Sequence, residues 1–349
     1  MTENIQELAA QSEVSQKIPD VARGPIVELV RRFGGSTADA ILDPSIRYFQ
    51  LDGVKGLIGY RLTRGCAIIF GDPTCALCDR DALARAFHLF AAKNNYRVIY
   101  ISASQDYALW ATQNICSSLV EFGEELIFQP PYDPRKNKGA CGSLVRRKTK
   151  QAIREGVSIH EYIPHDSKIE ESIEKVKDLW LESRSGPQVH ISNAYLFTDT
   201  YGKRWLYAKH KEKVIGVIVL NQMQSQNGWL LNHLMVIPEA PNGVPELLMA
   251  TALEMLEKEG SLFATVGSIA APQVGQIRGM GIVSAWVART VFKIANKVMQ
   301  LGGLNTFWGK FQPTRKPSYL IFSHKKIGIK ELMGLQQALS GTIKDHKNG

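Results

Sequence analysis

The second half of the chain contains three strand-like runs of apolar and β-branched residues between two helical segments. Short turns join the runs, and one of these turns is Asn227-Gly228, a strong hairpin signal. The predicted order is a helix at 169–184, strands at 204–209, 214–222 and 229–236, a loop, a helix at 246–259 and a strand at 263–267. A three-stranded meander between two helices favours a mixed α/β fold.

The first half repeats this alternation of strands and helices. Its predicted elements are strands at 56–61, 65–70, 98–101 and 124–128, a helix at 79–94 and a basic helix at 144–155. A chain of 349 residues suits two units of about 150–170 residues each. We expect two α/β lobes in tandem at 24–160 and 161–335, separated by a loop near 158–166. A polar arm at 1–23 and a tail at 336–349 complete the predicted organisation.

The charge of the chain predicts an anionic partner. The net charge is +9, and the basic residues gather at 135–154 and again at 293–316. Nucleic acid, a membrane surface and an anionic cofactor all satisfy this charge, and charge alone does not choose among them. The longest apolar runs fall far short of the roughly 20 residues that cross a bilayer, so we expect a soluble or peripheral protein.

The five cysteines are scattered along the chain, which favours a reducing cytoplasm. Cys75 and Cys78 have the spacing of a metal-ligand pair, but no second cysteine or histidine pair follows nearby. Because a structural zinc site needs about four ligands, we predict no metal site.

The segment from Leu234 to Gly260 is predicted to carry the chemistry. A strand there leads through a short loop into a helix N-terminus, where backbone N–H groups and the helix dipole favour an anion or a carbonyl oxygen. The segment resembles the central motif of GNAT acyltransferases, whose loop cradles the pyrophosphate of coenzyme A. In this chain the loop at 240–245 keeps only Gly243 of that pattern, contains two prolines and lacks arginine. We therefore expect GNAT-type lobes that do not use coenzyme A.

A wider series of motifs resembles the phosphatidylglycerol lysyltransferase C-terminal family, the catalytic part of aminoacyl-phosphatidylglycerol synthases. The resemblance covers roughly residues 43–322. The motifs are Gly-Asp-Pro at 71–73, Gly-Glu-Glu at 123–125, the basic helix at 142–156, the loop at 238–243, the turn at 267–272, and Lys-Phe-x-Pro at 310–313 followed by Pro-Ser-Tyr at 317–319.

The resemblance implies transfer of an aminoacyl group from aminoacyl-tRNA to the hydroxyl of an anionic membrane lipid, with no other cofactor. Such a transfer requires positioning of an activated ester, stabilisation of an oxyanion and movement of one proton. The chain departs from the family at His233 and Val236, where Asp and Arg are usual, and at Asn305 and Ser318, where Arg is usual. These departures leave the amino acid and the lipid open.

Candidate site residues follow from these motifs. His233 is a possible general base, since an imidazole titrates near neutral pH, and Lys310 is the second catalytic candidate. Each residue also has an interpretation without catalysis. His233 would then be a structural residue on a strand, and Lys310 would be a surface lysine. Backbone N–H groups around 242–246 are candidates for the oxyanion site. The predicted substrate contacts are Asn242, Gly243, Glu246, Gly267, Ser268, Arg278, Asn305 and Tyr319, and the predicted tRNA phosphate contacts are Lys136, Arg146, Arg147 and Lys150.

Residues 281–300 are predicted to form a basic amphipathic helix. Val283, Val287, Val291, Ile294 and Val298 recur on one side, all charges are positive, and Trp286 lies near the edge. This composition suits a helix on an anionic membrane or beside a lipid groove, with contacts from Trp286, Arg289, Lys293 and Lys297. A helix that packs on the core with a solvated polar face is the alternative.

Three functions remain open from the sequence. The first is an aminoacyl-tRNA-dependent transferase acting on a lipid, located in the cytoplasm at the inner face of the membrane. The second is a coenzyme A-dependent N-acyltransferase, which the loop at 240–245 disfavours. The third is a non-catalytic GNAT pair that binds tRNA or membrane, which the departures from the family favour.

Overall fold

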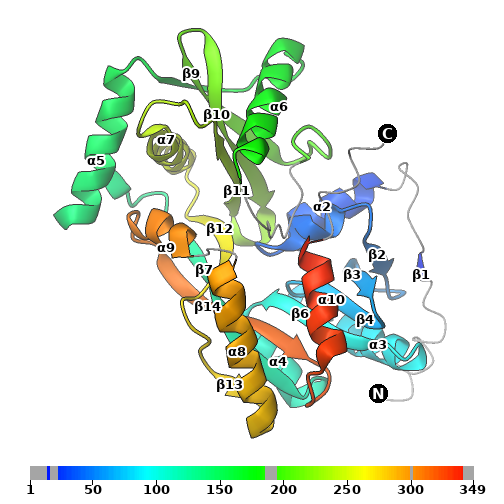
Figure 1. Cartoon of the computed structure of the whole chain (residues 1–349). Coiled ribbons are helices and arrows are strands. Elements are labelled where there is room, and N and C mark those ends of the chain that lie inside the picture. Colours follow the sequence, from blue (N-terminus) through cyan, green and yellow to red (C-terminus); the bar gives the residue numbers. More distant parts are fainter. Residues whose placement is uncertain (1–13, 16–22, 185–194, 299–301, 341–349) are drawn as a thin grey trace.

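The computed structural model describes residues 14–15, 23–184, 195–298 and 302–340 (Figure 1). The arm predicted at 1–23 and residues 341–349 of the predicted tail therefore lie largely outside the described residues. The predicted start of the tail at residue 336 is wrong, because residues 329–340 form a helix whose Ala338 is buried in the core. The side chain of Lys297 also lies outside them. The described part of the chain is a mixed sheet with helices packed against it, so the predicted α/β class is confirmed.

One sheet passes through both halves of the chain. Its order is β1-β2-β3-β4-β6-β14-β7-β12-β11-β10-β9-β8, with β13 paired to β7 and β5 paired to β3. The strands before residue 130 are β1 (Val14–Ser15), β2 (Arg47–Phe49), β3 (Gly56–Thr63), β4 (Cys66–Phe70), β5 (Thr74–Cys75), β6 (Arg97–Ala103) and β7 (Ser118–Phe128). The later strands are β8 (Ser158–Glu161), β9 (Lys203–His210), β10 (Lys213–Met223), β11 (Gly228–Val236), β12 (Phe263–Ala270), β13 (Ile277–Arg278) and β14 (Thr314–Phe322).

Helices connect these strands. The α-helices are α2 (Arg23–Phe33), α3 (Arg80–Lys93), α4 (Gln105–Asn114), α5 (Gly139–Arg154), α6 (Ser167–Glu182), α7 (Val244–Lys258), α8 (Ile282–Val298), α9 (Gly302–Gly309) and α10 (Ile329–Ser340). Short 3-10 turns occur at η2 (Ala38–Leu42), η3 (Leu77–Asp79), η4 (Pro134–Lys136) and η5 (Gln224–Gln226).

The second half has the predicted order of a helix, a meander, a loop, a helix and a strand. The helices α6 and α7 lie on opposite sides of β10 and β11 (Figure 1). Alternation along β10 explains this arrangement, because Val217 and Val219 pack with α6 whereas Ile218 and Leu220 pack with α7. The GNAT-type order predicted for this lobe is thus present.

The first half confirms the predicted strands and helices but adds elements that were not predicted. Helix α2 and helix α4 were missed, the latter begun by Ser104, whose side chain accepts a hydrogen bond from the N–H of Tyr107. The loop predicted at 158–166 is partly wrong, because residues 158–161 form β8 and pair with β9. Whether the chain divides into two units near residue 160 stays a prediction.

Two segments cross the predicted boundary between the lobes. Strand β14, from near the end of the chain, lies between β6 and β7 and pairs antiparallel with both. Helix α5, from the first half, packs against α7 through Val145 and Ala152. Strand β7 joins the two regions, since it pairs with β14 along one edge and with β12 along the other.

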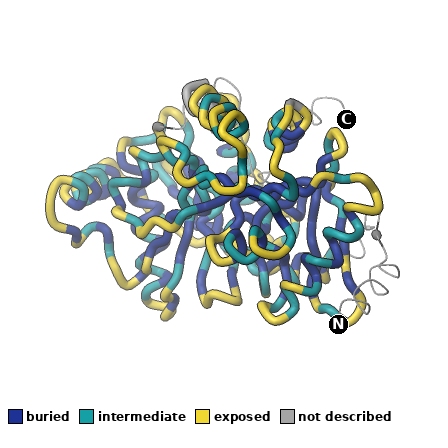
Figure 2. The backbone as a smooth tube through the Cα atoms, turned by 90° about the horizontal axis from the view of Figure 1, so that it is seen from below, coloured by how far each residue is buried: buried dark blue, intermediate teal, exposed yellow. Residues whose placement is uncertain are grey.

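Buried residues form a continuous band through the sheet, with exposed residues on the surrounding helices and loops (Figure 2). The largest clusters of buried apolar side chains lie on the two faces of each half. In the part of the chain that the structure describes, no helix combines the length and apolar composition needed to cross a bilayer.

Candidate functional site

Strands β11 and β12 separate after a short parallel pairing. Gly228, Trp229 and Leu230 pair with residues 263–265, and the recorded pairing ends there. Beyond this point β11 changes register against β10, and β12 changes register against β7. Gly267 lies at the second irregularity with a φ of 80°, a left-handed conformation that favours glycine. The sheet therefore opens between β11 and β12.

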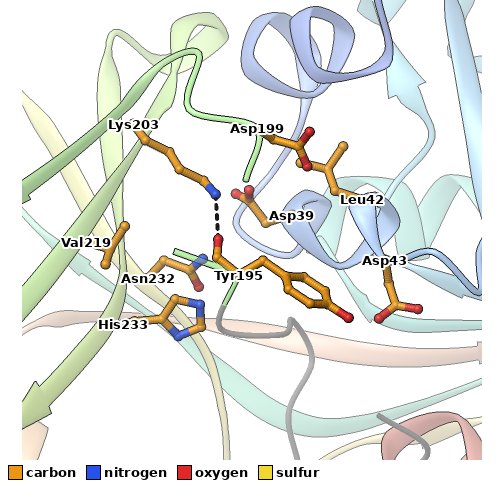
Figure 3. A pocket seen from close by; sticks show the side chains of 9 residues that line it. All are labelled: Asp39, Leu42, Asp43, Tyr195, Asp199, Lys203, Val219, Asn232 and His233. Atoms are coloured by element: carbon orange, nitrogen blue, oxygen red, sulfur yellow. Dashed lines mark hydrogen bonds between the residues drawn. The ribbon is translucent and has the colours of Figure 1, made fainter. Parts of the chain in front are cut away.

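His233 lies at this opening and lines a pocket formed by both halves of the chain. Figure 3 shows His233, Asn232 and Lys203 on one side of the pocket and Asp39 and Asp43 on the other. The complete lining is Asp39, Leu42, Asp43, Tyr195, Asp199, Lys203, Val219, Asn232 and His233. His233 is opposite Val219 in the β10–β11 register, on the face of the sheet that α6 covers. Substrate pockets often form at such internal interfaces.

Lys203 is an anchored cation in this pocket. Its Nζ donates hydrogen bonds to the carbonyl oxygens of Tyr195 at 3.0 Å and Thr198 at 2.6 Å. Burial lowers the pKa of Lys203 to about 8, although the nearby charge of Asp39 acts in the opposite direction. Lys203 therefore holds the segment before β9 in place and carries an ammonium group that loses its proton more readily than usual.

Three aspartates of the pocket pair with arginines from the first half. The pairs are Asp39 with Arg31 at 2.9 Å, Asp43 with Arg61 at 3.2 Å and Asp199 with Arg23 at 2.6 Å. Burial alone would raise the pKa of Asp39, but the charge and hydrogen bonds of Arg31 outweigh it and the pKa is lowered. Because each carboxylate has a cationic partner, the pocket combines polar groups with a nearly balanced charge.

A second polar cluster lies where β7 meets β12 and β14. Glu125 accepts a hydrogen bond from the hydroxyl of Thr265 at 3.2 Å, and Ser268 is opposite Glu125 in the register. The hydroxyl of Ser268 is 3.0 Å from that of Ser318. Burial raises the pKa of Glu125, and the charge of Asp72 acts in the same direction.

These residues come from four motifs that are far apart in the sequence. Asp72 belongs to Gly-Asp-Pro, Glu125 to Gly-Glu-Glu, Ser268 to the turn at 267–272 and Ser318 to Pro-Ser-Tyr. The motifs carry the family resemblance, yet Asp72, Glu125 and Ser318 were not among the predicted site residues. The carbonyl oxygen of Ser36 lies 3.6 Å from the Cβ position of Gly267, so residues 36–43 extend from this cluster to the His233 pocket.

Lys310 and Glu246 meet on the other face of the sheet. The Nζ of Lys310 lies 2.6 Å from Oε1 of Glu246 and 3.7 Å from the ring centroid of Phe307. The two charged side chains are 11% and 8% exposed. Because α7 carries Glu246 and packs on the face opposite α6, the structure separates the two predicted catalytic residues, Lys310 and His233.

The loop before α7 is covered by α5. Gly243 has a φ of 100°, and a Cβ on it would lie 2.0 Å from the carbonyl oxygen of Lys148. The Nζ of Lys148 donates a hydrogen bond to Oδ1 of Asn242 at 2.6 Å. The predicted contacts Asn242 and Gly243 thus pack against a helix of the first half, and they do not line the His233 pocket.

The remaining predicted substrate contacts are dispersed. Asn305 donates a hydrogen bond to the carbonyl oxygen of Ala270 at 2.9 Å and thereby joins α9 to the end of β12. Arg278 is exposed on β13, opposite Leu119 of β7. Tyr319 is buried in the core of the first half, and burial with the charge of Glu121 raises its pKa.

The predicted tRNA contacts divide into structural and exposed cations. Arg146 donates hydrogen bonds to the carbonyl oxygens of Arg135 and Asn137, so it holds the loop before α5. Lys136, Arg147 and Lys150 are exposed. Of the four predicted tRNA contacts, these three are therefore the solvent-exposed ones.

Trp286, Arg289 and Lys293 are exposed on α8.

Cys75 is buried and Cys78 is exposed, and both are free thiols. Among the described residues there is no group of three or more His, Cys, Asp or Glu side chains arranged to hold a metal ion.

Comparison with known proteins gives a consistent match over most of the chain. The model of a family described as "Phosphatidylglycerol lysyltransferase, C-terminal" matches residues 28–322. Phosphatidylglycerol lysyltransferases from two strains of Staphylococcus epidermidis are 22% identical over 298 residues, which cover 84% of this chain. The match spans only 35% of the length of these relatives.

Two solved structures share the fold along almost their whole length. The C-terminal DUF2156 domain of an Agrobacterium fabrum protein, assigned as a lysylphosphatidylglycerol synthetase, superposes with a TM-score of 0.76 at 16% identity, over 93% of this chain and 98% of that one. The structure of L-PGS from Bacillus licheniformis gives 0.73 at 16% identity, over 94% and 99% of the two chains. At such identities these matches establish the fold.

Proposed function

Because the chain belongs to the phosphatidylglycerol lysyltransferase C-terminal family, we propose that it transfers an aminoacyl group from aminoacyl-tRNA to a hydroxyl of a membrane lipid. The donor is an activated ester and the product is a second ester, so the reaction needs no further source of energy. The enzyme has to position two substrates and manage one proton.

The pocket around His233 is the observation that carries this proposal. It lies where β11 leaves β12, and its walls come from both halves of the chain. A polar, partly buried pocket of this kind can hold an ester carbonyl beside a proton acceptor. The adjoining polar cluster at Glu125 is largely buried, and its hydrogen bonds join residues from three of the motifs that carry the family resemblance.

His233 and Asn232 are assigned the main catalytic roles in the proposal. The oxygen of the lipid hydroxyl forms a bond to the aminoacyl carbonyl carbon, and the ester bond to the tRNA ribose breaks. The proton of the hydroxyl passes through the imidazole of His233 to the ribose oxygen. The amide of Asn232 lines the same pocket and suits the developing oxyanion, a role first expected for residues 242–246.

Helix α5 is proposed to hold phosphates of the tRNA acceptor stem. Lys136, Arg147 and Lys150 are exposed on or just before this helix, and cations of this kind bind phosphates without reading bases. The same helix argues against the coenzyme A alternative. Its backbone at Lys148 lies directly on Gly243, in the loop where acetyltransferases receive the pyrophosphate.

The test combines cellular lipids with a transfer assay. Mass spectrometry of lipids from cells with and without the gene is expected to show an aminoacylated species only when the gene is present. In the assay, His233→Gln is expected to lower kcat by about 10²–10⁴-fold, the usual contribution of a general base. His210→Gln, at the end of β9 and outside the pocket, serves as the matched control and is expected to keep full activity.

Two results would overturn the proposal. An unchanged lipidome together with no transfer in vitro would favour the non-catalytic alternative, a protein that binds tRNA or membrane. Transfer that persists in His233→Gln at the wild-type rate would retain the activity but remove His233 from its role.

A further inference from the structure

Helix α8 concentrates the exposed apolar surface of the protein. Twelve large apolar side chains are exposed in the described ranges, and five of them lie on this helix. Ile282, Val283 and Trp286 are 91%, 75% and 66% exposed, and Ile294 is 58% exposed. The other exposed apolar residues, such as Leu77 and Leu262, occur singly on different helices and loops. Single exposed residues are ordinary, but a contiguous group indicates an interaction surface.

The exposed face of α8 also carries cations. At 100° per residue, Arg289 and Lys293 share an arc with Ile282 and Trp286. Both cations are exposed, and the helix contains no acidic residue. Apolar side chains thus lie next to ammonium and guanidinium groups on one surface.

This arrangement differs from a helix packed on the core. The sequence pattern assigned Val283, Val287, Val291 and Ile294 to one apolar side, and packing on the core would bury them. In the structure Val283, Val291 and Ile294 are exposed, and only Val287 of these is half-buried.

We propose that α8 is a docking helix for an anionic lipid bilayer. Apolar side chains and a tryptophan enter the boundary between headgroups and acyl chains, while Arg289 and Lys293 bind lipid phosphates. The positive charge of the helix matches an anionic bilayer and opposes self-association through the same face. The helix lies on the bilayer surface and does not cross it.

The position of α8 in the chain connects this surface to the candidate site. The helix follows β13, which carries Arg278, and precedes α9, which carries Asn305 (Figure 1). Asn305 is in turn hydrogen-bonded to the end of β12. Docking of α8 would therefore orient the end of β12, beside the polar cluster, toward the membrane. The link between α8 and the candidate site rests on the proposed function. Binding of α8 to a bilayer does not, because it needs no catalysis.

The test is sedimentation of the full chain with lipid vesicles, without any aminoacyl donor. The wild-type protein is expected to bind vesicles of phosphatidylcholine mixed with phosphatidylglycerol, and to bind phosphatidylcholine alone more weakly. Ile282→Ser combined with Trp286→Ser is expected to weaken binding by at least about tenfold, because apolar area no longer leaves water. Arg289→Gln and Lys293→Gln are each expected to weaken binding to the anionic vesicles about fivefold, with less effect at high salt.

Matched controls lie elsewhere on the surface. Leu262→Ser removes an isolated side chain that is 66% exposed, and Lys325→Gln with Lys326→Gln removes two exposed cations. All three substitutions are expected to leave vesicle binding unchanged. Circular dichroism is expected to be unchanged in the α8 variants, since the altered side chains are exposed.

The proposal fails if the wild-type protein does not bind anionic vesicles, or if the α8 variants bind as tightly as the controls. It also fails if the variants change the oligomeric state in sedimentation velocity while vesicle binding is unchanged, because a second copy of the chain would then cover the helix. Vesicle binding without any aminoacyl transfer would keep the docking helix and reject the proposed function.

Discussion

At the scale of single residues, Glu246 contributes to the stability of a helix and of a buried ion pair. It lies in the first turn of α7, where the helix dipole stabilises a negatively charged side chain. It also forms an ion pair with Lys310, which lies 64 residues later in the sequence. The motif that contains Lys310 could be recognised in the sequence, but its partner could not be assigned from spacing. Loss of either member would leave a buried charge without its partner.

We expect Lys310→Met to lower the free energy of unfolding by about 3–5 kcal/mol, because Glu246 would remain buried and charged. The double variant with Glu246→Gln is expected to recover much of this loss, since both charges are then absent. Urea denaturation of the four proteins in this cycle measures the effect. Equal stability of Lys310→Met and the double variant would mean that the carboxylate is already well solvated.

The residues of the His233 pocket show where prediction from sequence ended. His233 could be selected because it departs from a motif, and it does line a pocket. Asp39, Asp199 and Lys203 have no local pattern that signals a site. They meet because α2, η2 and the segment before β9 pack together, which is a property of the tertiary fold. The grouping of Asp72, Glu125 and Ser318 likewise depends on the order of β7, β12 and β14 in the sheet.

At the scale of elements, the contact between α5 and α7 is the least expected feature of the second half. The basic helix was predicted correctly as an element of the first half, but its contact with α7 was not predicted. It packs on α7 because Val145 and Ala152 face the core that α7 covers. Because Gly243 has no side chain, the loop before α7 can lie directly against the backbone of α5 at Lys148.

Gly243→Ala is expected to destabilise the protein by more than the roughly 1–3 kcal/mol of an unfavourable backbone conformation, because its Cβ would also displace Lys148. Gly65→Ala is the matched control, since Gly65 has a φ of 77° and no heavy atom within 4 Å of its Cβ position. Urea denaturation gives the two losses, and amide hydrogen exchange along α5 reports its displacement. Equal losses in the two variants would show that α5 does not rest on Gly243.

At the scale of the whole molecule, the two halves share one sheet. Sequence periodicity predicted several of the longer strands in each half, because alternation of apolar residues is a local property, but it missed the short strands β2, β5, β8 and β13. It did not predict that β14 would lie between β6 and β7, since pairing partners far apart in sequence leave no local signal. The C-terminal helix α10 similarly packs on the first half, where Leu335 and Ala338 join its core.

A fragment of residues 23–128 is expected to remain unfolded, because β6 and β7 would lack the strand that lies between them. Thr314 is opposite Ile127, so a short Gly-Ser turn can join residue 128 to residues 311–340. This fused fragment is expected to recover strand and helix signals in circular dichroism and a cooperative thermal transition. A folded fragment of 23–128 alone would show that β14 is dispensable for the first half.

The central position of β14 also has a consequence for synthesis on the ribosome. When residues up to 128 have left the exit tunnel, β6 and β7 each expose an edge that nothing in the nascent chain can pair. Nearly two hundred further residues separate β7 from its partner in β14. The first half must therefore wait in an incomplete state while the second half is made, and unpaired edges of this kind invite aggregation. A sheet built from both ends of the polypeptide therefore leaves strand edges unpaired for most of the time that the chain is being made.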